Sequence, residues 1–338
     1  MTQTANQPHN DNSDDRNTGS RALLQVEDLT MSYYTQQGEV RAVDGVSFSV
    51  ERGQGFGLVG ESGCGKSSIA LSLLKILPES ARISAGSIVL DGLDLVPLSE
   101  DEMREYRWAR VSMVFQAAMN SLDPVYRVGD QIIEALEYHV ESAPAASVER
   151  VRELYDLVNL DTAFIPRYPH EYSGGMKQRA IIAMALACEP DLIIADEPTT
   201  ALDVIVQDRI LREMKNVQRE LDMGMIYISH DMAVIAEVSD VVGVMYAGKI
   251  VEFGSVSEIF NTPIHPYTRA LMSAFPSVTG EKRELATLSG EPPNLLDPPS
   301  GCRFHPRCPY ATEECATTAP PLVQVDEHWA YCWNPPED

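Results

Sequence analysis

Short apolar runs alternate with longer amphipathic segments over most of this 338-residue chain. Runs with alternating or continuous apolar positions, bounded by turn residues, predict β-strands. The predicted strands are Ala22–Tyr33, Val46–Val50, Gly55–Val59, Gly86–Gly92, Val111–Phe115, Leu192–Ala195, Met225–Ile228 and Val241–Tyr246. Residues Tyr34–Glu39 are expected to form a loop between the first two strands.

Apolar positions at the helical period of 3.6 residues predict helices between these strands. The predicted helices are Ser67–Leu77, Val128–Tyr138, Ser147–Val158, Asp203–Leu221 and Met232–Val238. Prolines at 144 and 166 interrupt a region of about 117–187 that is otherwise helical in pattern. Alternation of strands with helices indicates an α/β fold with a mainly parallel sheet, which binds ligands at its strand ends.

The segment Gly60–Ser67 has the G-x-x-x-x-G-K-[ST] pattern of a phosphate-binding loop, between a predicted strand and a predicted helix. Its small residues let successive N–H groups face an anion, and the positive helix N-terminus points at the same place. We expect Lys66 to reach the β- and γ-phosphates and the Ser67 hydroxyl to bind Mg²⁺. The residues expected to contact nucleotide here are Gly60, Ser62, Gly63, Cys64, Gly65, Lys66, Ser67 and Ser68.

Two acidic residues, Asp196 and Glu197, follow the apolar strand Leu192–Ala195. A buried strand would hold Asp196 rigidly at the sheet edge, where it can bind Mg²⁺ through water. Glu197 is expected to orient or deprotonate the attacking water. The adjacent Glu therefore favours hydrolysis over transfer of the phosphoryl group to another substrate.

A second anion-binding helix start is predicted at Ser173, Gly174 and Gly175, where Ser173 is a natural N-cap. One nucleotide cannot easily contact both this turn and the phosphate loop of the same subunit. The pattern therefore indicates a dimer in which each subunit's Ser-Gly-Gly turn covers the other subunit's nucleotide.

The order of these motifs, with Ala201-Leu202-Asp203 and Ser229-His230-Asp231 after them, resembles that of the ATP-binding-cassette (ABC) ATPases over roughly Leu23–Val256. The resemblance implies a P-loop nucleotide-binding domain with a RecA-like core, an antiparallel β subdomain and a helical insertion. It also implies further site residues for ATP and Mg²⁺. These are Gln116 as the Q-loop residue, Asp203 at the dimer interface, His230 as the switch histidine, and Tyr33, with Tyr34 adjacent, as the adenine-stacking aromatic.

Three further segments resemble the ATPases of oligopeptide and dipeptide importers. They are Phe115–Pro124, His265–Leu271 and Gly301–Pro309. This narrower resemblance implies a peripheral subunit on the cytoplasmic face of the membrane. It implies pairing with a second, different ATPase subunit beneath two transmembrane permease subunits, with an extracytoplasmic binding protein delivering the substrate. The segment after Gln116 would dock the permease.

The last sixty residues are rich in Pro and Cys, with few strand or helix signals, and we expect a separate small module at 279–338 after a nucleotide-binding domain at 21–278. Four thiolates can hold either Zn²⁺ or an iron–sulfur cluster, and no pair has the C-x-x-C spacing of zinc ribbons. A cluster suits the wider spacing, and the resemblance implies [4Fe–4S]. The candidate ligands are Cys302, Cys308, Cys315 and Cys332.

The chain carries 50 acidic and 26 basic residues, a net charge of −24. This charge argues against nucleic-acid binding and raises the hypothesis of a high-salt cytoplasm, with a merely acidic protein as the alternative. Residues 1–20 are polar and acid-rich, which predicts a disordered arm without a signal-peptide core. No run approaches the roughly 20 apolar residues of a membrane span, so a cytosolic location is expected.

Other functions remain open at this point. The cargo could be nickel or a sugar, as in relatives of these importers, or the chain could be a soluble, non-transport ABC ATPase. The latter class is expected to carry two cassettes or long arms and a basic face, which this sequence lacks. A regulatory protein with a relic site is opposed by the intact Lys66, Asp196, Glu197 and His230.

Overall fold

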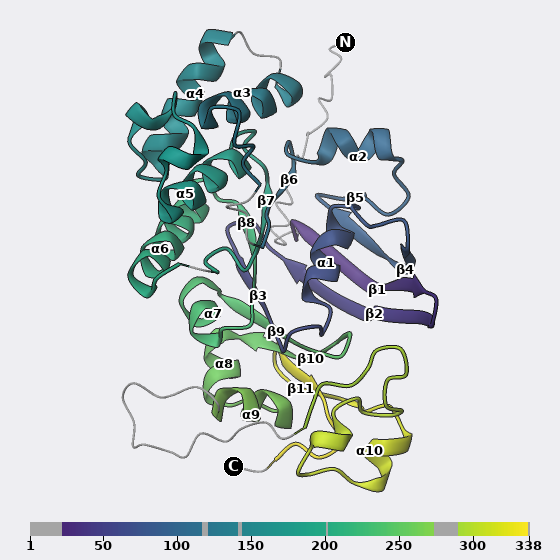
Figure 1. Cartoon of the computed structure of the whole chain (residues 1–338). Helices are drawn as coiled ribbons and strands as arrows, with labels where there is room; N and C mark the ends of the chain where they lie inside the picture. The colour runs from purple at the N-terminus through teal and green to yellow at the C-terminus, as the bar shows by residue number, and fades with distance from the viewer. Residues whose placement is uncertain (1–21, 117–120, 141–143, 201, 274–289, 337–338) are drawn as a thin grey trace, which may run out of the picture.

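The computed structural model describes residues 22–116, 121–140, 144–200, 202–273 and 290–336. Two sheets lie side by side, and a group of helices covers the far side of the larger one (Figure 1). The expected disordered arm at 1–20 and residues 117–120 after Gln116 lie outside the described residues. No helix within the described ranges is long and apolar enough to cross a membrane.

The smaller sheet is antiparallel and has the strand order β2-β1-β4-β5. Its strands are β1 (Leu24–Thr35), β2 (Gly38–Val50), β4 (Ala81–Leu90) and β5 (Leu93–Asp94). The prediction of a loop at Tyr34–Glu39 is wrong, because β1 and β2 continue into a tight hairpin and pair up to Thr35 and Gly38. Gly38 has a φ of 137°, a value that suits glycine at this turn.

The larger sheet has the order β11-β12-β10-β9-β3-β8-β7-β6. Strands β9, β3, β8, β7 and β6 run parallel, whereas β10, β12 and β11 pair antiparallel at one edge. The bounds are β3 (Gly55–Val59), β6 (Val111–Val114), β7 (Leu192–Asp196), β8 (Gly224–Ser229), β9 (Val241–Tyr246), β10 (Lys249–Ser255), β11 (Leu322–Val325) and β12 (His328–Tyr331).

Helices connect these strands and form most of the region between β6 and β7. The helices are α1 (Lys66–Leu73), α2 (Glu100–Tyr106), α3 (Val128–His139), α4 (Pro144–Leu157), α5 (Gly174–Ala185), α6 (Val204–Glu220), α7 (Met232–Val238), α8 (Val256–Asn261), α9 (Pro266–Ser273) and α10 (Glu313–Thr317). Short 3₁₀ helices are η2 (Thr162–Phe164), η3 (Pro169–Glu171) and η4 (His305–Arg307). Helix α1 ends earlier than predicted, before Lys75 in the left-handed region (φ 50°).

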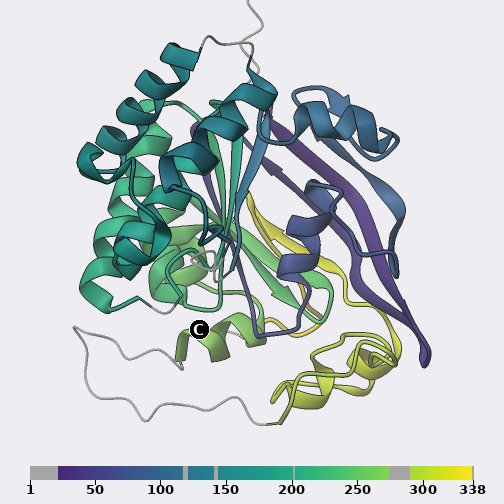
Figure 2. The same ribbon diagram turned by 45° about the horizontal axis from the view of Figure 1, so that its top comes forward.

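Two apolar clusters form the core. One joins α3, α4 and α5 to the larger sheet, and the other fills the space between the two sheets, where the rings of Phe48 and Phe56 stack with centroids 4.7 Å apart. Figure 2 shows the helices of the insertion on one side of the larger sheet and the smaller sheet on the other. Burial on both faces explains why the central strands are continuously apolar.

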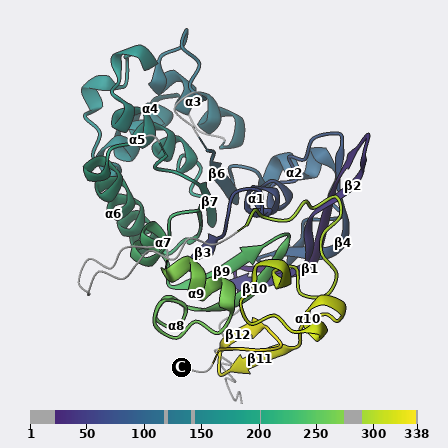
Figure 3. The same cartoon turned by 60° about the horizontal axis from the view of Figure 1, so that its bottom comes forward.

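The C-terminal residues are less separate than the sequence suggests. Strands β12 and β11, to which the sequence analysis assigned no strand, pair onto β10 and extend the larger sheet (Figure 3). Pairing of Glu252 with Ala330 and of Phe253 with Trp329 covers the edge of β10, whose N–H and C=O groups would otherwise lack a neighbouring strand. The tail therefore contributes to the same fold as the nucleotide-binding core.

A buried carboxylate, that of Glu252, makes hydrogen bonds that hold the C-terminal strand β12 next to β10. Glu252 has no exposed surface, and its oxygens accept hydrogen bonds from the backbone N–H groups of Ile264 (2.6 Å) and His265 (2.9 Å). One of them also lies 2.8 Å from Nε2 of His328 in β12. One side chain on β10 thus joins the C-terminal strand to the turn that precedes α9.

Replacing Glu252 with Ala should lower the free energy of unfolding by about 3 kcal/mol, because it leaves buried donors without an acceptor. Urea unfolding followed by circular dichroism measures this change. Glu327→Ala is the matched control, since Glu327 is exposed and adjacent to His328. Equal midpoints for the two variants would show that the buried carboxylate has no special role.

Candidate functional site

The predicted site residues lie at one edge of the parallel part of the larger sheet. The phosphate loop follows β3, His230 follows β8 and Glu197 follows β7. Gln116 is the second residue after the end of β6. These four strands are consecutive neighbours in the sheet and run in the same direction. Their carboxyl ends therefore meet at the position where open α/β sheets bind ligands.

The phosphate loop needs glycine at two positions because there is no space for a Cβ atom. At Gly60 (φ 154°) a Cβ atom would lie 2.1 Å from the carbonyl oxygen of Met245, and at Gly65 (φ 115°) it would lie 2.2 Å from that of Ala42. The loop leads directly into α1, which begins at Lys66, so the N-terminus of this helix lies at the end of the loop.

Lys66 is 7% exposed and bonds to its own loop. Its Nζ donates to the carbonyl oxygens of Gly60 (2.7 Å) and Glu61 (3.0 Å). Cys64 is buried beside it, and burial raises the pKa of its thiol. The lysine is thus held inside the curve of the loop, where it can meet a phosphate.

Asp196 is suited to bind a cation. It is 4% exposed, and its Oδ1 atom is buried without a hydrogen-bond partner in the described part of the chain. Burial raises the pKa of Asp196, while a hydrogen bond with Ser67 acts in the opposite direction. A buried carboxylate oxygen without a partner, next to a serine hydroxyl, fits the oxygen ligands that Mg²⁺ prefers.

Glu197 is held by three polar side chains. His230 Nδ1 lies 2.8 Å from Oε1, and Oε2 accepts hydrogen bonds from Gln116 Nε2 (3.0 Å) and Thr200 Oγ1 (3.0 Å). Burial would raise the pKa of Glu197, but the hydrogen bonds from His230 and Thr200, together with the electrostatic influence of His230 and Lys66, hold the pKa below its ordinary value. The carboxylate is therefore ionised at neutral pH, as a base must be.

The sequence analysis missed Thr200 in this group. Its only signal was a hydroxyl three residues after Glu197, a common and unspecific spacing. The left-handed backbone at Glu197 (φ 47°) turns the chain sharply after β7, and Thr200 N donates to Glu197 O (3.2 Å). This turn brings the Thr200 hydroxyl to the carboxylate.

The aromatic candidates differ in position. The hydroxyl of Tyr33 lies 3.2 Å from Ser68 Oγ in α1, whereas Tyr34 is 48% exposed. Tyr33 thus lies near the helix that follows the phosphate loop, in keeping with the choice of Tyr33 over its neighbour for adenine stacking.

The Ser-Gly-Gly turn and Asp203 cap their own helices. Ser173 Oγ accepts from Met176 N (3.3 Å) at the start of α5, and Asp203 Oδ1 accepts from Val206 N (3.0 Å) at the start of α6. Gly174 and Gly175 begin α5, and a Cβ atom at Gly175 would lie 2.8 Å from Val206. These contacts place the turn at the start of α5, next to the first turn of α6. Ala201 lies outside the described residues.

The four C-terminal cysteines are close enough to influence one another. Burial raises the pKa of Cys332 to about 12, and the thiols of Cys302, Cys308 and Cys315 add to the rise. Cys302 N also donates to the carbonyl oxygen of Cys315 (2.8 Å). Among the described residues, no three His, Cys, Asp or Glu side chains are grouped closely enough to hold a metal ion. The sequence prediction of a metal group therefore gains no direct support.

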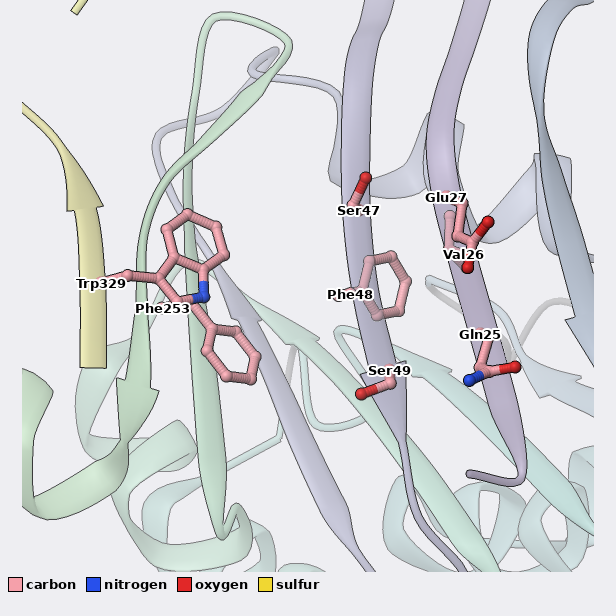
Figure 4. A pocket seen from close by; sticks show the side chains of 8 residues that line it. All are labelled: Gln25, Val26, Glu27, Ser47, Phe48, Ser49, Phe253 and Trp329. Atoms are coloured by element: carbon pink, nitrogen blue, oxygen red, sulfur yellow. The ribbon is translucent and has the colours of Figure 1, made fainter. Parts of the chain in front are cut away.

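A cavity of about 320 Å³ lies elsewhere, between the smaller sheet and strands β10 and β12 (Figure 4). Phe253 and Trp329, whose rings stack 5.6 Å apart, line it together with Phe48. The predicted site residues are not among those that line this cavity, which is separate from the phosphate loop.

Two family models match the chain. Residues 43–200 match a model described as "ABC transporter", and residues 251–315 match "Oligopeptide/dipeptide transporter, C-terminal region". The dipeptide transport ATP-binding protein DppD of Bacillus subtilis (strain 168) is 45% identical over 315 residues, which cover 92% of this chain and 94% of DppD. This chain belongs to the ATP-binding subunits of oligopeptide/dipeptide ABC transporters. As a member of that family it is an ATPase that uses ATP and Mg²⁺.

A second relative supports this family, and solved structures share the cassette fold. The oligopeptide transport ATP-binding protein OppD of Escherichia coli (strain K12) is 43% identical over 320 residues, covering 94% of each chain. The dimeric ABC transporter cassette MJ0796 has a TM-score of 0.62 at 24% identity and covers 69% of this chain and 98% of its own. The cbiO1 subunit of Clostridium perfringens has a TM-score of 0.62 at 27% identity and covers 71% of this chain and 91% of its own. The predicted cassette fold is confirmed.

Proposed function

We propose that this ABC ATPase energises the import of dipeptides or oligopeptides through a membrane transporter. The observation that carries the peptide assignment is the match of residues 251–315 to the oligopeptide/dipeptide transporter C-terminal region. The names of DppD and OppD support the same substrate class. We place the chain on the cytoplasmic face of the membrane, bound to two permease subunits that receive peptide from an extracytoplasmic binding protein.

The site residues divide the work of hydrolysis. Lys66 and the N–H groups of residues Gly60–Ser68 bind the phosphates, with the adenine on Tyr33. Ser67, Asp196 and Gln116 would hold Mg²⁺, which neutralises charge on the β- and γ-phosphate oxygens. Glu197 accepts a proton from the attacking water while His230 keeps the carboxylate oriented. The 2.8 Å contact between His230 and Glu197 supports this arrangement.

The nucleotide site is completed by a second subunit in this proposal. Ser173 caps α5, and Gly174 and Gly175 form its first turn, so this helix start can offer its N–H groups to a nucleotide on the partner. Asp203 lies beside the exposed Val204 and Ile205 (79% and 82% exposed), an apolar surface suited to subunit contact. We favour a different ATPase subunit as the partner.

Replacing Glu197 with Gln in the assembled transporter should lower ATPase activity by at least about 100-fold, since the carboxylate is the base. Uptake of a labelled dipeptide should stop, while ATP-bound dimers accumulate on size-exclusion chromatography. Glu153→Gln, an exposed change on α4, is the control. Hydrolysis at the wild-type rate would refute the base assignment, and uptake of nickel or a sugar instead of peptide would refute the cargo.

We also propose that the tail, taken as residues 279–338, holds a [4Fe–4S] cluster on Cys302, Cys308, Cys315 and Cys332. The thiols of Cys302, Cys308 and Cys315 raise the pKa of Cys332, so the four side chains lie near one another. No pair has the C-x-x-C spacing of zinc ribbons, and a cluster suits the wider spacing along the sequence. We therefore favour the larger cluster, with a structural role, over Zn²⁺.

Protein purified without oxygen should contain about four iron and four acid-labile sulfide per chain, with broad visible absorption. Cys308→Ser should lose the iron and make the tail more sensitive to protease, while MgATP binding remains. Cys188→Ser, a change within the helical region, is the control and should keep the iron. One zinc per chain and no iron would support the alternative, and neither metal would refute both.

The acidic composition supports a separate proposal that the protein works in a high-salt cytoplasm. Repulsion within a chain of net charge −24 should weaken as salt screens it. The melting temperature should therefore be higher in molar KCl than at low ionic strength, as measured by differential scanning calorimetry. Equal melting temperatures would leave the acidity without a link to salt.

A further inference from the structure

The C-terminal region contacts the phosphate loop through Glu61, the second residue of the loop. Arg307 donates from both terminal nitrogens to the Glu61 carboxylate, at 2.6 and 3.0 Å. Its side chain is 6% exposed, and Glu61 is 24% exposed. A nearly buried, two-point pair of this kind is stronger and more directional than a surface ion pair.

A second contact reaches the backbone of the same residue. The N–H of Glu61 donates to the hydroxyl of Tyr267 in α9 (2.9 Å), and Tyr267 is fully buried. The carbonyl of Glu61 accepts from Lys66 Nζ (3.0 Å). The side chain, N–H and C=O of Glu61 are therefore each fixed by a different partner.

Aromatic packing joins the two contacts into one unit. The rings of Tyr246 and Tyr267 lie 4.7 Å apart, and both pack against Phe304, which is 1% exposed. Arg307 also donates to the Tyr246 hydroxyl (3.3 Å). Arg307 and Phe304 lie between Cys302 and Cys308, so the cysteine-bearing segment itself packs on the loop.

Arg303 makes a parallel connection from the same segment. It bonds to Asp44 and to the carbonyl oxygen of Ala247. Gly248, which follows Ala247 in the chain, donates its N–H to the carbonyl oxygen of Cys64 in the phosphate loop (2.8 Å). The loop is thus contacted at two points, Glu61 and Cys64, by residues that come later in the chain.

We propose that Arg307 and Tyr267 are positioning residues that hold the phosphate loop in its nucleotide-binding shape. Fixing the Glu61 peptide preorganises the N–H groups that meet the phosphates, which lowers the entropy lost on binding. Pairing with Arg307 also neutralises the negative charge of the Glu61 carboxylate, which would otherwise repel the negatively charged nucleotide. The tail therefore sets the nucleotide affinity of the cassette.

Isothermal titration of the full-length chain with MgADP tests this, because binding requires neither turnover nor transported cargo. Arg307→Gln should weaken binding about tenfold, within the usual range for coupled sites. Arg307→Lys, which keeps the charge but not the paired hydrogen bonds, should weaken it about threefold. Tyr267→Phe, which removes only the acceptor for Glu61 N–H, should also weaken it about threefold.

Arg179→Gln is the matched control, because Arg179 forms a similarly buried pair with Glu213 (12% exposed each) between α5 and α6. It should leave the Kd for MgADP within about twofold of wild type, with melting curves confirming that each variant is folded. In a Glu61→Gln background, removing Arg307 should cost less than about threefold, since the two residues act as one unit. Arg307→Gln binding as tightly as Arg179→Gln, or an undiminished loss in the Glu61→Gln background, would overturn the proposal.

Discussion

The parallel pairing of β3, β8, β7 and β6 is the constraint on which the nucleotide site depends. Each strand delivers one component at its carboxyl end, and the sheet fixes the spacing between them. Such a sheet is stable only with apolar layers on both faces. The stacked Phe48 and Phe56 on one side and the helical insertion on the other provide those layers. The packing that stabilises the sheet therefore also fixes the positions of the site residues relative to one another.

Three buried or half-buried carboxylates show how surroundings assign roles to one functional group. Glu252 is fully buried and bonded to donors from two other segments, the turn before α9 and strand β12, so it is structural. Asp196 is nearly as buried, but one of its oxygens has no partner among the described residues, which makes it available to a cation. The hydrogen bonds of Glu197, the next residue, lower its pKa, and a left-handed backbone turns the chain at this position. Neighbours in sequence thus acquire different chemistry.

The sequence was enough to predict that the candidate residues lie at neighbouring strand ends. The phosphate loop follows β3, and Asp196 and Glu197 stand at the end of β7, so the apolar pattern of each strand locates them. The hairpin at Tyr34–Glu39 was predicted wrongly, because its strands are stabilised by pairing across the turn rather than by their own apolar pattern. The partners of Glu61 were missed for a related reason. Tyr267 and Arg307 lie 206 and 246 residues further along the chain, so only the folded structure brings them together.

The hydrogen bonds that Lys66 makes to its own loop have a consequence for the energetics of ATP binding. The ammonium group of Lys66 donates to the carbonyl oxygens of Gly60 and Glu61, so the loop contains a cation that joins its own backbone together. A phosphate that binds Lys66 would compete with these oxygens for the N–H donors of the ammonium group. The enthalpy of binding would then be a difference between two hydrogen-bonded states, because the buried charge of Lys66 already has acceptors in its own loop.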